Sequence, residues 1–341
     1  MLKGKTILVT GGTGSFGHQI VSAMLQRGPA EVRIFSRDEK KQDDMRFHFG
    51  NDPRLRFIIG DVRDRLSLIA ATVGAQLVFH AAALKQVPSC EENVIEAVLT
   101  NTLGAANVIE ACIRNRVQEV VAISTDKAVK PVNAMGMTKA LQERLFIAAS
   151  LRPDIGGTEF QIVRYGNVLG SRGSVVPLFK KQLERGVPLT VTDRSMTRFL
   201  LTLDEAIGLV FTAMKDGVGG EIFVQKSKAL SAGDLADVMA RSVRPPAKIR
   251  EIGARSGEKM HEVLISEEEA LHTAERRDHF VIIPRTMNAN TARRYRSQRY
   301  LRKTFEYSSN TAPRMTKTDI GRLLKEKGWL GAGKGKQEVF I

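Results

Sequence analysis

The side chains best suited to chemistry in this 341-residue chain gather in one short stretch, STDKAVKPVNAMGMTK at 124–139. It places a hydroxyl, a carboxylate and an amine in a row at Thr125, Asp126 and Lys127, with a second amine at Lys139. A carboxylate and an amine can work as general acid and general base when burial and neighbouring charges adjust their pKa values. The stretch therefore predicts proton-transfer chemistry.

The acid and base roles depend on what surrounds each group. Asp126 can be a general acid if burial raises the pKa of its carboxyl group. Lys127 can be a general base if crowding by other cations lowers the pKa of its ammonium. Met135, four residues before Lys139, carries a thioether with no proton to give and almost no basicity, so we expect it to pack rather than react.

The elements that must position these groups alternate along the first half of the chain. Apolar, β-branched runs of strand length are separated by segments with helical spacing, which predicts a parallel sheet covered on both faces. After KTILVT near the N-terminus, the runs lie at 31–38, 55–64, 75–83, 119–124 and 159–170. The expected fold class is α/β, a Rossmann-type doubly wound parallel sheet with a smaller C-terminal substrate-binding lobe. Ligands bind at the carboxyl ends of strands in such sheets, where STDK lies.

The domain organisation follows from where this alternation fades. We expect a dinucleotide-binding domain at 4–166 and, at 167–284, mainly a substrate-binding lobe with segments that return to the sheet. Residues 285–341 are expected to form a C-terminal extension that could make oligomer contacts. Within these parts, 187–214 predicts a strand, a loop and a helix, and 316–328 predicts a helix.

A glycine-rich loop, TGGTGSFG, lies directly between the first strand and the first helix. Glycines at this place allow a tight turn, let the backbone approach a pyrophosphate and permit close packing of helix on strand. The helix N-terminus then offers free N–H groups to the phosphates. We therefore predict dinucleotide binding. The cofactor contacts expected from this loop are Gly11, Thr13, Gly14, Ser15, Phe16 and Gly17.

The end of the second strand indicates which dinucleotide binds. Ser36 stands where an acid would hold the ribose of NAD, and Arg37 and Lys40 follow, which favours the 2′-phosphate of NADP. NAD is the alternative, and Asp38 is the residue that would support it. Asp61 and Val62, after the third strand, are placed to flank the adenine. The other expected cofactor contacts are Ala81, Ala82, Lys85, Asn101 and Lys139.

Together these motifs resemble the extended short-chain dehydrogenase/reductase superfamily. Within it the chain is similar to the soluble UDP-N-acetylglucosamine 4,6-dehydratases that also invert C5 and serve bacterial capsule, O-antigen and flagellin-glycan synthesis. Members of the capsule type also have methionine where most relatives have tyrosine. The resemblance runs from about residue 4 to about residue 330 and is carried by TGGTGSFG, FSRDEKKQDDM, HAAALKQVP, STDKAVKPVNAMGMTK, VRYGNVLGSRGSVVPLF, LTVTDRSMTRFLLTLDEA, GEKMHE and EYSSN.

The resemblance implies oxidation at C4 of a UDP-sugar, loss of water across C5 and C6, and return of the hydride to C6. It assigns Asp126 as the acid at C6 and Lys127 as the base at C5. Lys139 would bond the nicotinamide ribose, and Thr125 would touch O4 and relay its proton. Whether C5 is inverted or retained stays open, with inversion favoured.

The substrate side should offer cations and polar groups to a diphosphate, a uridine and a hexose. By resemblance Arg198 meets the diphosphate, Lys85 faces the hexose and Glu258 bonds a ribose hydroxyl. The full set of expected substrate contacts is Lys85, Asn167, Arg172, Val175, Arg198, Arg255 and Glu258.

Composition narrows the class of protein. The chain is 43% hydrophobic and 26% charged, and no apolar run reaches the roughly 18 residues that span a membrane, so we expect a cytoplasmic protein. Two cysteines and six histidines without ligand spacing predict neither a disulfide framework nor a metal site. The net charge of +15 is concentrated partly at 293–303, without any nucleic-acid motif. That segment and EYSSN are candidate contacts of a homo-oligomer, a hexamer or smaller.

Other functions remain open at this point. A 4-epimerase of UDP-hexoses would keep the fold, although it usually relies on the tyrosine that is missing at Met135. A non-enzymatic NADP-binding protein would explain Met135, but not the presence of Asp126, Lys127 and Lys139 together. Nucleic-acid binding through the basic segment is the remaining alternative.

Overall fold

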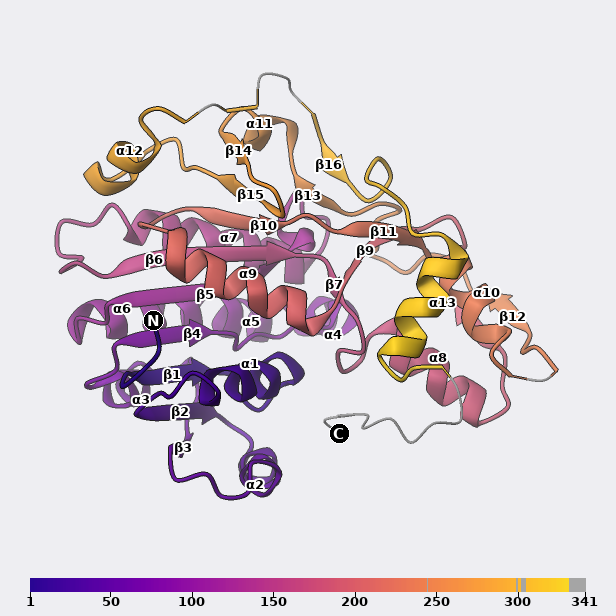
Figure 1. The fold of residues 1–341 in the computed structure, drawn as a ribbon, viewed down its shortest axis with the longest axis horizontal. Coiled ribbons are helices and arrows are strands. Elements are labelled where there is room, and N and C mark those ends of the chain that lie inside the picture. The colour runs from indigo at the N-terminus through magenta and orange to yellow at the C-terminus, as the bar shows by residue number, and fades with distance from the viewer. Residues whose placement is uncertain (244, 299, 302–304, 331–341) are drawn as a thin grey trace.

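The computed structural model describes residues 1–243, 245–298, 300–301 and 305–330. Within them, nine strands form a central sheet in the order β14-β15-β10-β6-β5-β4-β1-β2-β3 (Figure 1). Strands β3 to β10 in this order pair in parallel, while β15 and β14 are antiparallel additions at one edge. The strands are β1 Thr6–Thr10, β2 Glu31–Ser36, β3 Leu55–Ile59, β4 Leu77–His80, β5 Glu119–Thr125, β6 Glu159–Tyr165, β10 Ile222–Gln225, β14 Thr273–Glu275 and β15 His279–Ile282.

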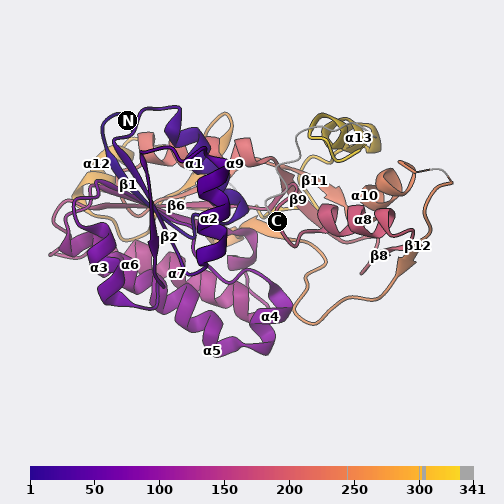
Figure 2. The ribbon, with the colours of Figure 1, turned by 90° about the horizontal axis from the view of Figure 1, so that it is seen from below.

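Helices cover both faces of the sheet, as expected for parallel strands buried on two sides. Figure 2 shows α3, α6 and α7 along one face and α1 and α9 along the other. The α/β doubly wound fold class is therefore confirmed, with each of the six predicted strands in place. The helices of this part are α1 Ser15–Leu25, α2 Glu39–His48, α3 Arg65–Thr72, α4 Val87–Glu92, α5 Val94–Ala97, the π-helix η1 Val98–Leu103, α6 Gly104–Arg114, α7 Ala134–Ala149 and α9 Leu203–Asp216.

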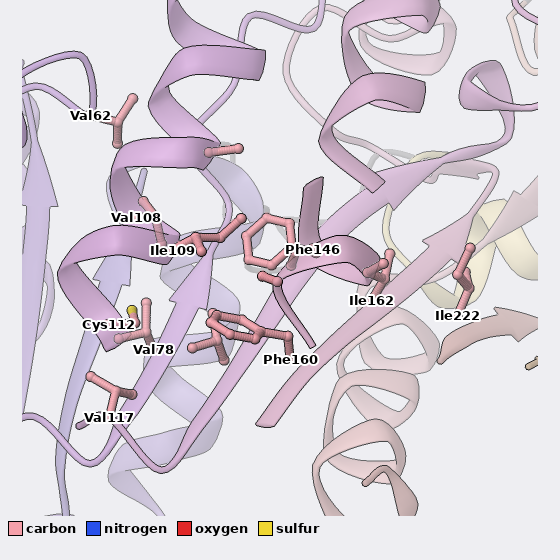
Figure 3. Packing of buried hydrophobic residues seen from close by; sticks show 14 of the residues in the cluster. Val62, Val78, Val108, Ile109, Cys112, Val117, Phe146, Phe160, Ile162 and Ile222 are labelled. Atoms are coloured by element: carbon pink, nitrogen blue, oxygen red, sulfur yellow. The ribbon is translucent and has the colours of Figure 1, made fainter. Parts of the chain in front are cut away.

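One large apolar cluster joins the helices of the first face to the sheet (Figure 3). Phe146 of α7 packs against Phe160 of β6 with ring centroids 5.8 Å apart, and both side chains are fully buried. Aromatic pairs of this kind contribute about 0.5–1.5 kcal/mol beyond the area they bury. This packing holds α7, and with it Lys139, against the strand that ends at Thr125.

A smaller lobe lies beyond the carboxyl ends of the strands, to the right in Figure 1. Its own apolar cluster joins α8, α10 and α13, including Phe179, Leu235 and Leu324. The strand β9 and the helix α12 are elements that the sequence patterns did not predict. The remaining elements are β7 Asn167–Val168, α8 Val175–Glu184, β8 Leu189–Val191, β9 Thr197–Leu201, β11 Lys228–Ser231, α10 Ala232–Ala240, β12 Ile249–Glu251, β13 Val263–Ile265, α11 Glu267–Ala270, α12 Ala289–Tyr295, β16 Tyr307–Ser308 and α13 Lys317–Glu326.

Among the described residues, no helix combines the length and the apolar character needed to cross a membrane. Cys90 and Cys112 are both buried, and both are free cysteines. The described residues also contain no cluster of side chains that could hold a metal ion.

Candidate active site

A pocket of about 600 Å³ lies between the carboxyl ends of the parallel strands and the smaller lobe. Of the 26 site residues predicted from the sequence, 18 line this pocket. The fold therefore brings together motifs that are distant in the sequence. The 18 residues are Gly11, Gly14, Ser15, Phe16, Gly17, Ala81, Ala82, Lys85, Thr125, Lys127, Met135, Lys139, Asn167, Arg172, Val175, Arg198, Arg255 and Glu258. The others lie outside its lining: Thr13, Ser36, Arg37, Lys40, Asp61, Val62, Asn101 and Asp126.

The glycine loop lies between β1 and α1, as its motif predicts. Gly11 has a φ of +68°, and a Cβ there would lie 2.7 Å from the backbone of Ala82, so only glycine fits. Gly14 begins α1 without any side-chain cap, and the first turn of α1 holds no acidic residue. The free N–H groups and the positive end of the helix dipole therefore face the loop, as a pyrophosphate requires.

The ends of β2 and β3 hold the residues expected at the adenosine ribose. Arg37 is half exposed, and its guanidinium lies 3.6 Å from Asp61. Asp38 instead caps α2, accepting a hydrogen bond from the Lys41 backbone and pairing with the Lys41 ammonium at 2.8 Å. Its carboxylate is therefore engaged within the chain. The hydroxyl of Ser36 accepts a hydrogen bond from Gln42.

Three of the predicted cofactor residues are engaged elsewhere. Lys40 is highly exposed and pairs with Asp44 on its own helix at 2.8 Å. Val62 is a core residue, 4% exposed, against which a Cβ at Gly104 would clash. Asn101 is fully buried in the π-helix, where its amide bonds the backbone of Leu84 and the hydroxyl of Thr138. Asn101 thus supports the pocket wall at Leu84 from behind, while Val62 belongs to the core.

The STDK stretch forms the centre of the site. Strand β5 ends at Thr125, and the single turn η2, Asp126–Ala128, follows at once. Helix α7 crosses this turn so closely that a Cβ at Gly136 would lie 2.3 Å from the Lys127 carbonyl oxygen. Lys127 Nζ donates to Asp126 Oδ1 at 3.0 Å and to Asn167 Oδ1 at 3.3 Å, and Thr125 Oγ1 donates to Asp126 Oδ1 at 2.9 Å.

Asp126 is fully buried, directly behind the pocket wall. Burial raises the pKa of its carboxyl group above the ordinary value, with Lys127 opposing the shift and Glu262 adding to it. This is the direction that a general acid needs. Its Oδ2 has no hydrogen-bond partner among the described residues, so Asp126 would reach a substrate through Thr125 or by a small movement past Gly166.

The expectation for Lys127 was wrong in its direction. Burial and the nearby Arg198 do act to lower the pKa of the Lys127 ammonium, but the carboxylates of Asp126 and Glu262 outweigh them and raise it. The surroundings of Lys127 are mainly anionic because the fold brings Glu262 next to it. Glu262 lies far from Lys127 in the sequence, so local spacing did not indicate this contact. Lys127 therefore rests as an ammonium, and its work as a base needs a group that takes its proton.

Glu262, Lys259 and Asn133 are polar residues of the site that sequence reasoning missed. Glu262 lies 3.1 Å from Lys127 and 3.7 Å from Lys259, and the Lys259 ammonium donates to the carbonyl of Val129. Asn133 caps α7 and donates to the Gly257 carbonyl, so it joins the two lobes. The sequence signal for Glu262 and Lys259 was the GEKMHE segment, in which two carboxylates and an amine lie close together.

Lys139 is buried beneath the pocket and points its ammonium back to the end of β5. It donates to the Ile123 carbonyl and to Gln142 Oε1, each at 2.6 Å. Burial lowers the pKa of Lys139 to about 8, partly opposed by Glu143. At neutral pH it therefore supplies positive charge under the place where a nicotinamide ribose would lie.

Met135 lines the pocket from the first turn of α7. Its side chain is 4% exposed and belongs to a small apolar cluster with Cys90 and Ala97. This agrees with a packing role, and the same cluster closes the pocket on this side with groups that neither donate nor accept strongly.

The substrate-side residues surround the opposite half of the pocket. The backbone N–H of Arg172 donates to Ser15 Oγ, so the loop after β7 contacts the glycine loop directly. Burial, together with Arg172, lowers the pKa of Lys85. Arg198 lines the pocket, and its Nη1 donates to the carbonyls of Thr197 and Met260 while its Nη2 donates to Met196 Sδ.

The EYSSN segment is partly buried inside the chain, and its predicted oligomer contacts stay a prediction. Tyr307 and Ser308 form β16 beside β13, and Ser308 and Ser309 are buried inside the chain. Ser309 Oγ accepts from the backbone N–H of Glu262 at 2.9 Å. The segment therefore supports the site. The basic segment 293–303 lies partly outside the described residues, and its predicted oligomer contacts stay a prediction.

Comparisons with known proteins agree with this architecture. The model of a family described as polysaccharide biosynthesis protein matches residues 7–284. Proteins named UDP-glucose 4-epimerase are similar over most of their length: one from Rickettsia rickettsii is 45% identical over 95% of this chain and 96% of its own, and one from Rickettsia felis is 50% identical over 79% and 80%.

Solved structures give the same picture of the fold. Pen from Bacillus thuringiensis matches with a TM-score of 0.90 and 39% identity over 97% of this chain and 100% of its own. A dTDP-glucose 4,6-dehydratase from Streptomyces venezuelae, crystallised with NAD, matches with a TM-score of 0.69 and 23% identity over 85% and 97%. At that identity the second likeness concerns the fold alone.

Proposed function

Since the chain belongs to the polysaccharide biosynthesis protein family, we propose that it is a nucleotide-sugar-modifying enzyme of the short-chain dehydrogenase/reductase type, and specifically a UDP-N-acetylglucosamine 4,6-dehydratase. The family and the names of the relatives support the broader statement. The specific reaction rests on one observation: a buried Asp126, Lys127 and Glu262 cluster stands at the end of β5 beside an inert Met135.

That arrangement suits elimination of water. Elimination needs a base at C5 and an acid at C6, both held in place, and the cluster supplies a protonatable carboxyl group and an amine 3.0 Å apart. Epimerisation and dehydration both begin with oxidation at C4, for which Thr125 would serve beside the inert Met135, but epimerisation needs no base at C5 and no acid at C6. The cluster therefore favours dehydration.

The residues present fit a nicotinamide dinucleotide. Gly11, Gly14 and Ser15 and the uncapped start of α1 would hold the pyrophosphate, Arg37 the 2′-phosphate of NADP, and Lys139 the nicotinamide ribose. When bound, such a cofactor accepts a hydride from C4 of the sugar and returns one to C6. NADP is the proposed cofactor because Asp38 is engaged as the cap of α2.

The chain's own groups would handle the protons. Thr125 would hydrogen-bond the C4 oxygen and pass its proton to Asp126, which accepts a hydrogen bond from the Thr125 hydroxyl. Lys127, as the amine, would take the C5 proton, which is acidified once C4 is a ketone. Asp126, whose pKa is raised by burial, would then pass on the proton from Thr125 to the C6 hydroxyl, which leaves as water. Reprotonation of C5 from the opposite face would invert that carbon.

UDP-hexose 4-epimerase is the second candidate, and the names of the Rickettsia relatives favour it. Incubation of the NADP-loaded protein with UDP-N-acetylglucosamine and, separately, UDP-glucose distinguishes the two by mass spectrometry. A dehydratase gives a product lighter by one water, whereas an epimerase leaves the mass unchanged. Unchanged mass with a new C4 configuration in the proton NMR spectrum would refute the dehydratase assignment. The couplings of a 4-keto product would also report whether C5 is inverted.

The cofactor assignment makes a direct prediction. Replacing Arg37 by Ala should weaken NADP binding by about 10- to 100-fold, since a hydrogen bond to a charged group is worth about 1.5–3 kcal/mol. NAD binding should change little, because NAD lacks the 2′-phosphate. Fluorescence titration of both cofactors measures this, with the exposed Arg56 of β3 replaced by Ala as the matched control. Equal losses for NADP and NAD would contradict the assignment.

A second prediction concerns position 135, where methionine replaces the tyrosine of most relatives. Replacing Met135 by Tyr should leave kcat within about tenfold of the wild type, because the proposed proton path runs through Asp126 and Lys127. Steady-state dehydration assays at saturating substrate measure it, with a thermal melt to check that the ring fits beside Cys90. A much larger gain would mean that the native enzyme lacks an effective C4 base.

A further inference from the structure

Glu262 is the buried titratable group of the pocket that the proposed mechanism does not yet use. It lines the pocket, its side chain is 3% exposed, and Oε1 lies 3.1 Å from Lys127 Nζ. Oε2 has no hydrogen-bond partner among the described residues and lies 3.7 Å from Lys259 Nζ. A buried carboxylate with one open oxygen is expensive to keep unless it has a task.

The backbone around Glu262 is held from two sides. Its N–H donates to Ser309 Oγ and its carbonyl accepts from the Ser309 N–H at 2.8 Å, while the neighbouring His261 bonds the hydroxyl of Thr197. Ser309 also bonds Thr197 at 2.7 Å. Three segments distant in sequence therefore converge to place one carboxylate against Lys127.

We propose that Glu262 is the proton acceptor through which Lys127 becomes a base, which makes it a positioning residue for the reaction. This inference rests on the proposed dehydratase function. One proton moves from Lys127 Nζ to Glu262 Oε1, giving a neutral amine and a neutral acid. The C5–H bond then breaks, its proton goes to Lys127 Nζ, and its electron pair enters the enolate with C4. No oxidant or reductant is needed for this step.

The physical reason lies in the change of environment when substrate binds. In the open pocket Lys127 is partly exposed, and water stabilises the ion pair with Glu262. A UDP-sugar that fills the pocket removes that water, and in a dry site buried ions are costly enough that a pair tends to neutralise. The proton can move without any change in net charge, because acceptor and donor are already in contact.

The charged groups facing this pair come from several elements. Asp126 of η2 lies against Lys127, Lys259 lies beside Glu262, and Arg198 of β9 acts on both. The two carboxylates and Lys259 leave the cluster near neutrality, so the loss of Glu262 would expose Lys127 to net positive surroundings. The pKa of Lys127 is therefore expected to fall when Glu262 is replaced by a neutral residue.

Replacing Glu262 by Gln should lower kcat by about 100-fold or more at neutral pH, with little change in KM. Glutamine cannot take a proton, so only Lys127 that has lost its proton to solvent can act. The variant's rate should therefore rise about tenfold per pH unit across a range where the wild type is flat. Glu262→Asp should keep the flat profile at a reduced kcat. The exposed Glu268, replaced by Gln, is the matched control on the same segment.

Two outcomes would overturn the proposal: wild-type kcat in Glu262→Gln, or a loss that is the same at every pH, as a purely structural role would give. A measurement without turnover covers the case in which the chain proves not to be a dehydratase. NMR titration of ¹³C-labelled lysines, with Lys127 assigned through Lys127→Arg, should show a lower pKa of Lys127 in Glu262→Gln than in the wild type. An unchanged pKa would refute the coupling, whereas absence of dehydration by the wild type would refute only the proposed reaction.

Discussion

Lys127→Met is expected to lower kcat for dehydration by about 10²- to 10⁴-fold while cofactor and UDP-sugar still bind. Methionine keeps the length and apolar stem of lysine but removes the amine that contacts both Asp126 and Glu262. Single-turnover mass spectrometry measures the chemical step, and fluorescence titration measures cofactor affinity. Lys181→Met, an exposed lysine on α8, is the control for a nonspecific effect of the change in charge.

Two further variants test the roles of Lys127 and of its neighbour Asp126. Lys127→Arg keeps a positive charge but cannot give up its proton, so it should be about as inactive as Lys127→Met if the amine is a base. Substantial activity in Lys127→Arg would mean that only the charge matters. Asp126→Asn removes the buried proton donor and should also abolish turnover with the cofactor still bound; retained dehydration would remove Asp126 from the mechanism.

Arg164→Met is expected to destabilise the folded protein by about 3–5 kcal/mol, because it leaves two carboxylates without their shared cation. Arg164 of β6 is 1% exposed and contacts Glu143 of α7 at 2.6 Å and Glu269 of α11 at 2.9 Å. Its Nη1 also donates to the carbonyl of Leu264. Urea unfolding followed by circular dichroism gives the free energy of unfolding for both proteins.

The pH dependence of this loss has a defined sign. Burial acts against ionisation of Glu269, but Arg164 outweighs it and lowers the pKa of that carboxyl group in the folded protein. This contribution to stability is present above the unfolded-state pKa and is lost as pH falls through the lower folded-state pKa. In Arg164→Met only the backbone hydrogen bond from Ser266 and the charge of Arg144 still oppose burial, so we expect that pKa to rise. The difference in stability should therefore be large at neutral pH and shrink as pH falls toward about 4.

A combined variant tests the cause. Arg164→Met with Glu143→Gln and Glu269→Gln removes the charges together, and such neutral replacements of buried ion pairs often cost little. It should recover most of the stability lost in the single variant. If it does not, packing rather than charge explains the loss. Glu143 also accepts a hydrogen bond from Ser124 at 2.5 Å, so the triple variant should additionally be checked for activity.

How much could be read from the sequence differs between the fold and the site. The alternation of apolar runs with helical segments was enough to place the six parallel strands of β1 to β6, since burial on both faces leaves a local imprint. The glycine loop and STDK lay at the expected strand ends for the same reason. The antiparallel β14 has only three residues, whereas β9 has five, as many as β1, but lies in a stretch where the pattern predicts a loop.

For the site, the sequence by itself determined which groups stand next to one another at the end of β5: Thr125, Asp126 and Lys127, with Met135 and Lys139 on the following helix. Only the tertiary structure decided their electrostatics. Glu262 reaches Lys127 because β13, which follows it, packs beside η2, and this reverses the shift that neighbouring cations alone would produce. A pKa depends on every charge within a few ångströms in space, and spacing along the chain reports only those that are close in sequence.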